Sequence, residues 1–116
     1  MKKDPRVYLD DIVSAIRDII GHIGKMTKEE FLNDIKTQDT VIRKVEIIGE
    51  AVKRLPIELC ESHPNVPWKR MAGMRDKLAH DYADVDLVIL WNVARHEIPD
   101  LQNTVTELLQ HINAPK

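Results

Sequence analysis

Apolar side chains that recur every three or four residues dominate the first half of the chain. One stripe lies between residues 9 and 23, and a second lies between residues 41 and 55. Their members are Leu9, Ile12, Val13, Ile16, Ile19, Ile20 and Ile23, then Val41, Val45, Ile48, Val52 and Leu55. Because an α-helix turns once in about 3.6 residues, this spacing places the apolar side chains on one face of a helix. Each stripe therefore predicts an amphipathic helix that packs against other helices.

Signals for helix ends divide the middle of the chain. Thr27 and Glu30 have the spacing of a capping box, which predicts a short helix before the second stripe. Pro56 ends the helix of the second stripe. The segment 56–67 contains three prolines and is expected to be a loop with one helical turn. Trp68 is expected to open the next helix.

The last apolar stripe lies within residues 87–112. Asp84 and Asp86 precede it and can cap a helix. Pro99 lacks a backbone donor, so a kink or a break is expected there. Gly49 lies inside the helix of the second stripe, where glycine costs about 1 kcal/mol relative to alanine. We expect that cost to be offset by the close approach of another backbone.

These patterns predict an all-α protein, an up-and-down bundle of four to five helices, because short connections favour antiparallel neighbours. The 116 residues fit one domain, expected to span residues 1–116. A single cysteine, Cys60, cannot form an intramolecular disulfide, and acids stand where a signal peptide needs an apolar core, so a cytoplasmic location is expected. The longest apolar run, 87–91, is too short to span a bilayer, so no membrane role is expected.

The stretch 68–82, WKRMAGMRDKLAHDY, contains the candidate site. Residues 68–80 contain four cationic side chains and one carboxylate, which gives this stretch a net charge of +3 in a chain whose formal net charge is −2. The four cations are Lys69, Arg70, Arg75 and Lys77, and the carboxylate is Asp76. Residues 84–110 carry a net charge of −4. This basic strip is compatible with a phosphate site.

Arg75 and His80 have side chains suited to phosphate chemistry. The planar fork of an arginine matches a phosphate in bidentate fashion. A histidine near a helix C-terminus is favoured in its protonated form and can act as an acid or base near neutral pH. On a continuous helix the two residues would lie about 140° apart around the axis. Either the helix ends near Ala79, or the pairs of two subunits meet across a groove.

The residue types alone favour a simpler explanation, in which a solvated charged face ends in a histidine. Three blocks in this order change that balance, because they resemble the HepT-like branch of the HEPN superfamily. The blocks are IIGEAVKRLP at 47–56, VPWKRMAGMRDKLAHDY at 66–82 and VDLVILWNVARHEIPDL at 85–101. The motif R-x4-H-x-Y of that branch is present as Arg75, His80 and Tyr82. Lys44 departs from the resemblance, because asparagine is common at that position.

The resemblance implies a homodimer whose subunits line a shared cleft with their arginines and histidines. Many such proteins are metal-independent endoribonucleases. On that basis His80 is expected to act as general acid/base, Arg75 to hold the scissile phosphate and Asp76 to orient the pair. Lys69, Arg70 and Lys77 are expected to bind the RNA. No cofactor or metal is expected, because the gap between Cys60 and His63 is not completed to a zinc site.

The resemblance also implies a toxin encoded beside a nucleotidyltransferase antitoxin, which adds AMP to Tyr82 and so repels substrate. Two alternatives remain open. One is a non-catalytic nucleotide-binding subunit that uses Arg75 and His80 to hold a nucleotide for a nucleotidyltransferase partner; the net charge and the scarcity of aromatic residues favour it. The other is a helical interaction module whose basic strip pairs with the acidic segment 84–107 of a neighbour.

Overall fold

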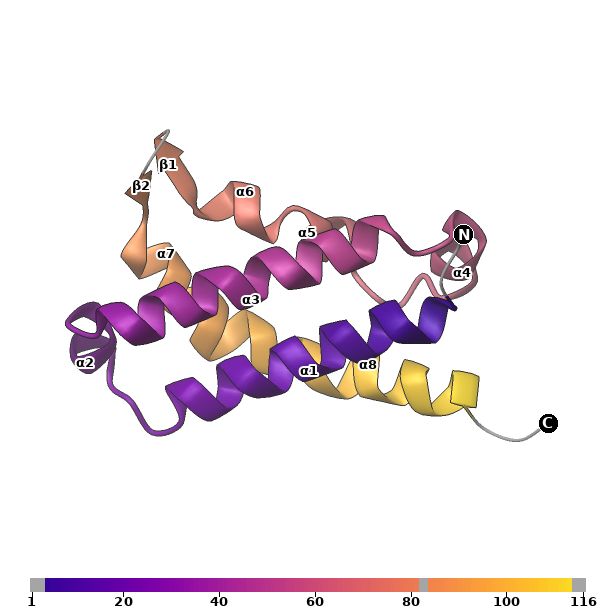
Figure 1. Cartoon of the computed structure of the whole chain (residues 1–116), viewed down its shortest axis with the longest axis horizontal. Helices are drawn as coiled ribbons and strands as arrows, with labels where there is room; N and C mark the ends of the chain where they lie inside the picture. The colour runs from indigo at the N-terminus through magenta and orange to yellow at the C-terminus, as the bar shows by residue number, and fades with distance from the viewer. Residues whose placement is uncertain (1–3, 82–83, 114–116) are drawn as a thin grey trace.

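The computed structural model describes residues 4–81 and 84–113 as a bundle of helices that alternate in direction along one long axis (Figure 1). The long helices are α1 (Pro5–Ile23), α3 (Ile35–Lys53) and α8 (Ile98–Asn113). Helix α1 packs against both α3 and α8. The described residues form eight α-helices and one π-helical segment, more than the four to five helices expected. The all-α class and the helical bundle are confirmed.

The additional helices are short. They are α2 (Lys28–Leu32), α4 (Ile57–Ser62), α5 (Trp68–Ala72), α6 (Met74–Leu78) and α7 (Leu87–Asn92). The π-helical segment η1 (Val93–Glu97) joins α7 to α8. None of the helices that the structure describes is long and apolar enough to cross a membrane.

Local capping interactions fix the ends of several helices. Asp4 caps α1 by accepting a hydrogen bond from the Arg6 amide at 2.9 Å. The predicted capping box of α2 is confirmed, because the Thr27 amide donates to Glu30 Oε1 at 2.9 Å and the Glu30 amide donates to Thr27 Oγ1 at 3.1 Å. Asp86 caps α7 through the amides of the second and third residues that follow it.

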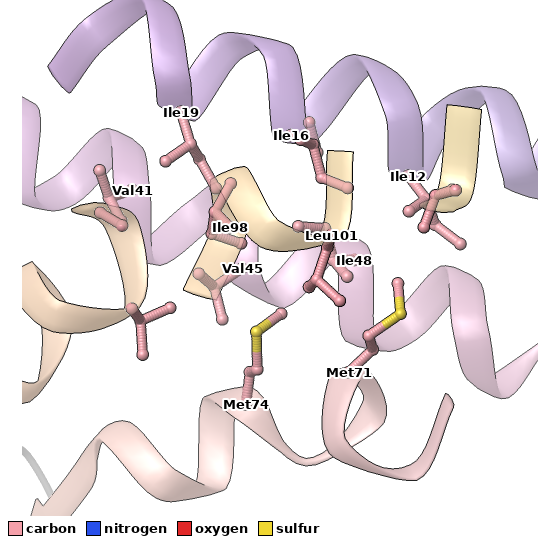
Figure 2. Close-up of a cluster of buried hydrophobic side chains, with 14 of the residues drawn as sticks. Ile12, Ile16, Ile19, Val41, Val45, Ile48, Met71, Met74, Ile98 and Leu101 are labelled. Atoms are coloured by element: carbon pink, nitrogen blue, oxygen red, sulfur yellow. The ribbon is translucent and has the colours of Figure 1, made fainter. Parts of the chain in front are cut away.

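The core lies between the long helices and the segment that contains the motif. Side chains from α1, α3, α5, α6 and α8 meet there, each at most 3% exposed (Figure 2). They include Ile12, Ile16, Ile19, Val41, Val45, Ile48, Met71, Met74, Ile98 and Leu101. Full burial of one such side chain stabilises the fold by about 1.5–3 kcal/mol. Met71 and Met74 therefore anchor both α5 and α6 onto the bundle.

Gly49 marks the place where α5 crosses α3, as the sequence predicted. A Cβ atom at this position would lie 3.3 Å from the Ala72 carbonyl oxygen, which belongs to the backbone of α5. Contacts this close are rare for Cβ atoms, so only a glycine lets the two backbones approach to this distance without a shift.

The segment that opens at Trp68 is not one helix. Gly73 separates α5 from α6, and its amide donates to the Lys69 carbonyl at 3.1 Å. Glycine is a weak helix former, and the methionines on either side of Gly73 are held by the core. The segment therefore bends at Gly73, whereas the apolar pattern alone predicted a continuous helix.

A short antiparallel ribbon follows α6, where no strand was expected. It consists of β1 (Ala79–Asp81) and β2 (Asp84–Val85), with Ala79 opposite Val85. Its hairpin projects from one end of the bundle (Figure 1). The chain must reverse between α6 and α7 within a few residues, which favours extended backbone over helix. Tyr82 lies outside the described residues.

The irregularity expected at Pro99 takes the form of η1. The helix does not break, because α7, η1 and α8 follow one another without a gap. The Ile98 amide donates to the carbonyl of Val93, five residues earlier, instead of four. Pro99 has no amide hydrogen, and its ring would clash with the carbonyl of Arg95 in a regular α-helix. A wider turn just before the proline relieves that clash.

Candidate nucleic-acid site

Arg75 is presented at the surface by α6. Its neighbour Met74 and the last residue of the helix, Leu78, are buried against the core, which leaves Arg75 exposed between them. The Arg75 side chain is 65% exposed, and its Nε lies 3.8 Å from Oε1 of Glu46 on α3. This separation exceeds a hydrogen bond, so the ion pair is weak and the guanidinium remains accessible to a ligand.

Glu46 of α3 is the carboxylate that lies beside Arg75, although it comes 29 residues earlier in the sequence. Glu50 of the same helix lies elsewhere, in a recess of about 360 Å³ that is also lined by Tyr8 and Arg54. Of these two acids, Glu46 is the one that reaches the motif arginine.

The helix that contains Arg75 ends before His80. Helix α6 stops at Leu78, and the backbone of His80 belongs to β1. The separation of about 140° that a continuous helix would impose therefore does not apply. This is the first of the two arrangements expected for the pair, a helix that ends near Ala79. The side chain of His80 is outside the part of the chain that the structure describes.

Glu97 binds two of the four cations of the basic strip. Arg70 donates from Nε and Nη2 to Glu97 Oε1 at 2.9 and 2.7 Å, and Lys77 donates from Nζ to Oε2 at 3.1 Å. Both carboxylate oxygens are thus used by side chains on either side of the Gly73 bend. The contacts span 27 and 20 residues of sequence. The opposite charges of the two segments were the only signal of this pairing in the sequence.

The environment of Glu97 keeps it ionised at neutral pH. Its side chain is only 14% exposed, and burial by itself raises the pKa of the carboxyl group. The hydrogen bonds from Arg70 and Lys77, together with their charges, outweigh burial and lower the pKa of Glu97 below its ordinary value. Glu97 therefore acts as a charged anchor, with hydrogen bonds that are stronger than those between neutral groups.

The other predicted residues are more isolated. Asp76 is exposed, and within the described residues it forms no hydrogen bond or ion pair with Arg75. Lys69 is exposed beside a shallow apolar groove of about 660 Å³. Trp68 lines the same groove and donates from Nε1 to the carbonyls of Cys60 and His63 at 3.1 and 3.0 Å. These hydrogen bonds give Trp68 a role in packing the loop against α5.

Two other positions singled out in the sequence are Lys44 and the pair of Cys60 and His63. Lys44 Nζ pairs with Asp18 Oδ2 at 2.9 Å, which links α3 to α1. Within residues 4–81 and 84–113, no group of three or more His, Cys, Asp or Glu side chains is placed to hold a metal ion.

The structure therefore defines a small helical domain that presents an arginine from a short helix, and the strand that follows contains the motif histidine. Residues 12–108 match the family model described as ribonuclease HepT-like. This match covers most of the chain, and the chain belongs to the HepT-like ribonuclease family.

Relatives of nearly the same length support this assignment. The chain is 44% identical over 111 residues to "Putative RNase MJ0127" of Methanocaldococcus jannaschii, covering 96% of this chain and 92% of that protein. It is also 44% identical over 108 residues to "Probable ribonuclease HepT" of Thermococcus cleftensis, covering 93% of this chain and 98% of that protein. No solved structure is significantly similar to the chain.

Proposed function

We propose that the protein is a metal-independent endoribonuclease whose active site contains Arg75 and His80. The observation that carries this proposal is the complete R-x4-H motif, placed where α6 gives way to β1, in a member of the HepT-like ribonuclease family. Membership alone gives the class of activity. The exposure of the Arg75 guanidinium supports its proposed role in binding an RNA phosphate.

The reaction follows from the chemistry of the two side chains. His80 accepts the proton of a ribose 2′-hydroxyl, whose oxygen then attacks the adjacent phosphorus. The bond to the 5′-oxygen of the next nucleotide breaks, and that oxygen takes up a proton from the protonated histidine, which returns to its neutral form. The products are a 2′,3′-cyclic phosphate and a 5′-hydroxyl. Arg75 stabilises the charge that develops on the phosphate oxygens during attack.

Two subunits complete the site in this proposal. The arginine and histidine of each chain face those of its partner across a shared cleft. Both pairs then line the surface that binds the RNA phosphate and on which the cleavage takes place. The exposure of Arg75 supports this arrangement, since the residue lies at the surface where a second chain can approach. Lys69 is the cation of the basic strip that forms no ion pair within the described residues. It extends the phosphate-binding surface.

Tyr82 is proposed as the point of control, in a toxin that a nucleotidyltransferase antitoxin inactivates by adding AMP. The tyrosine follows His80 by two residues, so a bound AMP would add negative charge beside the site and repel RNA. Intact mass after co-expression with a nucleotidyltransferase encoded by the adjacent gene should increase by whole AMP units. The increase should be absent from the Tyr82→Phe variant, and an unchanged wild-type mass would contradict the proposal.

The endoribonuclease is tested by replacing Arg75 and His80 with alanine, singly and together. Arg75 is exposed, and we expect the variants to keep the helical circular dichroism spectrum and to lose RNA cleavage by at least about 100-fold. Asp100→Asn, an exposed residue of α8, is the matched control and should cleave like the wild type. Cleavage by the double variant at the wild-type rate would exclude this active site.

A second candidate is a non-catalytic subunit that holds a nucleotide for a nucleotidyltransferase. The pairing of Arg70 and Lys77 with Glu97 favours it, because two of the four cations are already partly neutralised and a long polyanion gains less from them. Calorimetry with ATP and AMP, beside an assay on total RNA, separates the two candidates. Nucleotide binding by a dimer that leaves RNA uncut supports the second.

A further inference from the structure

Glu97 connects the two halves of the motif segment. Arg70 belongs to α5 and Lys77 to α6, and the chain bends between them at Gly73. Both cations bind the same carboxylate, at 2.7 Å from Arg70 Nη2 and 3.1 Å from Lys77 Nζ. The carboxylate therefore spans the bend and resists any hinge motion of α6 relative to α5.

The burial of the three side chains distinguishes this cluster from an ordinary surface ion pair. The side chain of Glu97 is 14% exposed, whereas those of Arg70 and Lys77 are 50% and 54% exposed. A partly buried carboxylate with both oxygens occupied holds its partners in defined directions. The exposed part of each cation still faces solvent, where a phosphate can approach.

The same cluster sets the direction of Arg75. Residues two apart on a helix lie about 200° apart around its axis. Because Lys77 is held on Glu97 of η1, Arg75 is turned to the other side of α6, where Glu46 of α3 lies 3.8 Å away. The contact with Glu97 thus adds to the burial of Met74 and Leu78 in holding the rotation of α6. Strand β1, which contains His80, continues directly from α6.

The position of Glu97 depends on η1. A π-helical turn contains more residues than an α-helical turn and changes the direction of the side chains within it. In this chain the wide turn ends at Glu97, immediately before Ile98 and Pro99. The proline thus accounts for a local geometry in which Glu97 reaches α5 and α6.

We propose that Glu97 is a positioning residue of the ribonuclease site. By binding Arg70 and Lys77, it fixes the rotation of α6 and hence the placement of Arg75 and of the strand that contains His80. This inference rests on the proposed endoribonuclease activity. A different role would be neutralisation alone, in which Glu97 only reduces the positive charge that RNA meets.

The two roles predict different kinetics for Glu97→Gln, which keeps the size of the side chain and removes its charge. Loss of positioning should lower kcat about tenfold or more, with KM changed by less than about threefold, because small displacements of reacting groups have large effects on rate. Loss of neutralisation alone adds positive charge, so it should lower KM and leave kcat unchanged. The substrate is a single-stranded RNA oligonucleotide. The assay temperature is kept well below the melting temperature of each variant.

Matched variants test whether stability explains the result. Glu97→Asp keeps the charge and should recover part of kcat, while Asp100→Asn, three residues further along, should match the wild type. A triple variant, Arg70→Gln with Lys77→Gln and Glu97→Gln, removes the cluster without leaving one of its charges unpaired. It should fold and still show a reduced kcat.

The positioning role and the ribonuclease activity fail in distinguishable ways. If the wild type does not cut RNA, the proposed function fails, and the positioning role fails with it. If the wild type cuts RNA and Glu97→Gln retains the wild-type kcat, whether or not its melting temperature falls, only the positioning role is overturned. An unchanged kcat in the triple variant has the same meaning.

Discussion

Arg75 and Glu97 show how much of the site depends on contacts between residues distant in sequence. The motif identified Arg75 and the local charge identified Arg70 and Lys77, because residue type and spacing are local properties. Their partners were not predicted, since Glu46 and Glu97 come from other helices and meet the strip only after the bundle has formed. One of the alternatives left open paired the basic strip with the acidic segment of a neighbouring chain, whereas Glu97 pairs with that strip within its own chain.

The lowered pKa of Glu97 predicts a specific dependence of stability on pH. A carboxyl group with a lower pKa in the folded protein stabilises the fold fully above the pKa it has when unfolded, about 4.3 for an ordinary glutamate. That stabilisation is lost as the pH falls through the lower, folded-state pKa. Glu97→Gln should therefore be less stable than the wild type at pH 7, and the difference should shrink in acid. Urea unfolding at pH 7 and at pH 3 measures both differences, and an equal difference at the two pH values would contradict the assignment.

At the scale of helices and strands, the long elements were predicted from the sequence and several of the short ones were not. Helices α1, α3 and α8 were found because long apolar stripes and local caps determine them. The bend at Gly73 and the ribbon of β1 and β2 were not predicted, and the irregularity at Pro99 was predicted as a kink or a break and not as a π-helical turn. These features depend on how short segments are held by the core, as Met71 and Met74 are, and on how the backbone adapts to Pro99.

The crossing of α5 over α3 predicts different effects of the same substitution at two glycines. Gly21, in α1, has open space where a Cβ would lie, so Gly21→Ala should stabilise the fold by about 0.5–1 kcal/mol through helix propensity. At Gly49 the new Cβ would lie 3.3 Å from a backbone oxygen, and the packing of α5 would have to shift. Gly49→Ala should therefore cancel or reverse that gain. Thermal unfolding of the two variants provides the comparison, and equal stabilisation would mean that α5 moves away without cost.

At the scale of the whole molecule, the proposed shared cleft can be tested with mixed dimers. Arg75→Ala and His80→Ala chains with different affinity tags should each be inactive alone. When the two are co-expressed and the mixed dimer is isolated, one intact arginine and one intact histidine remain in different subunits. Partial recovery of cleavage is expected if both subunits line one cleft. A mixed dimer as inactive as either parent would confine each site to a single chain.

The alternation of helix directions places the two ends of the described bundle together. Pro5, where α1 begins, and Asn113, where α8 ends, lie at the end opposite the ribbon of β1 and β2 (Figure 1). A protein fused at either point would extend away from the motif segment. Fluorescent reporters attached at both ends can therefore test for the proposed dimer in living cells without covering the surface where RNA is expected to bind.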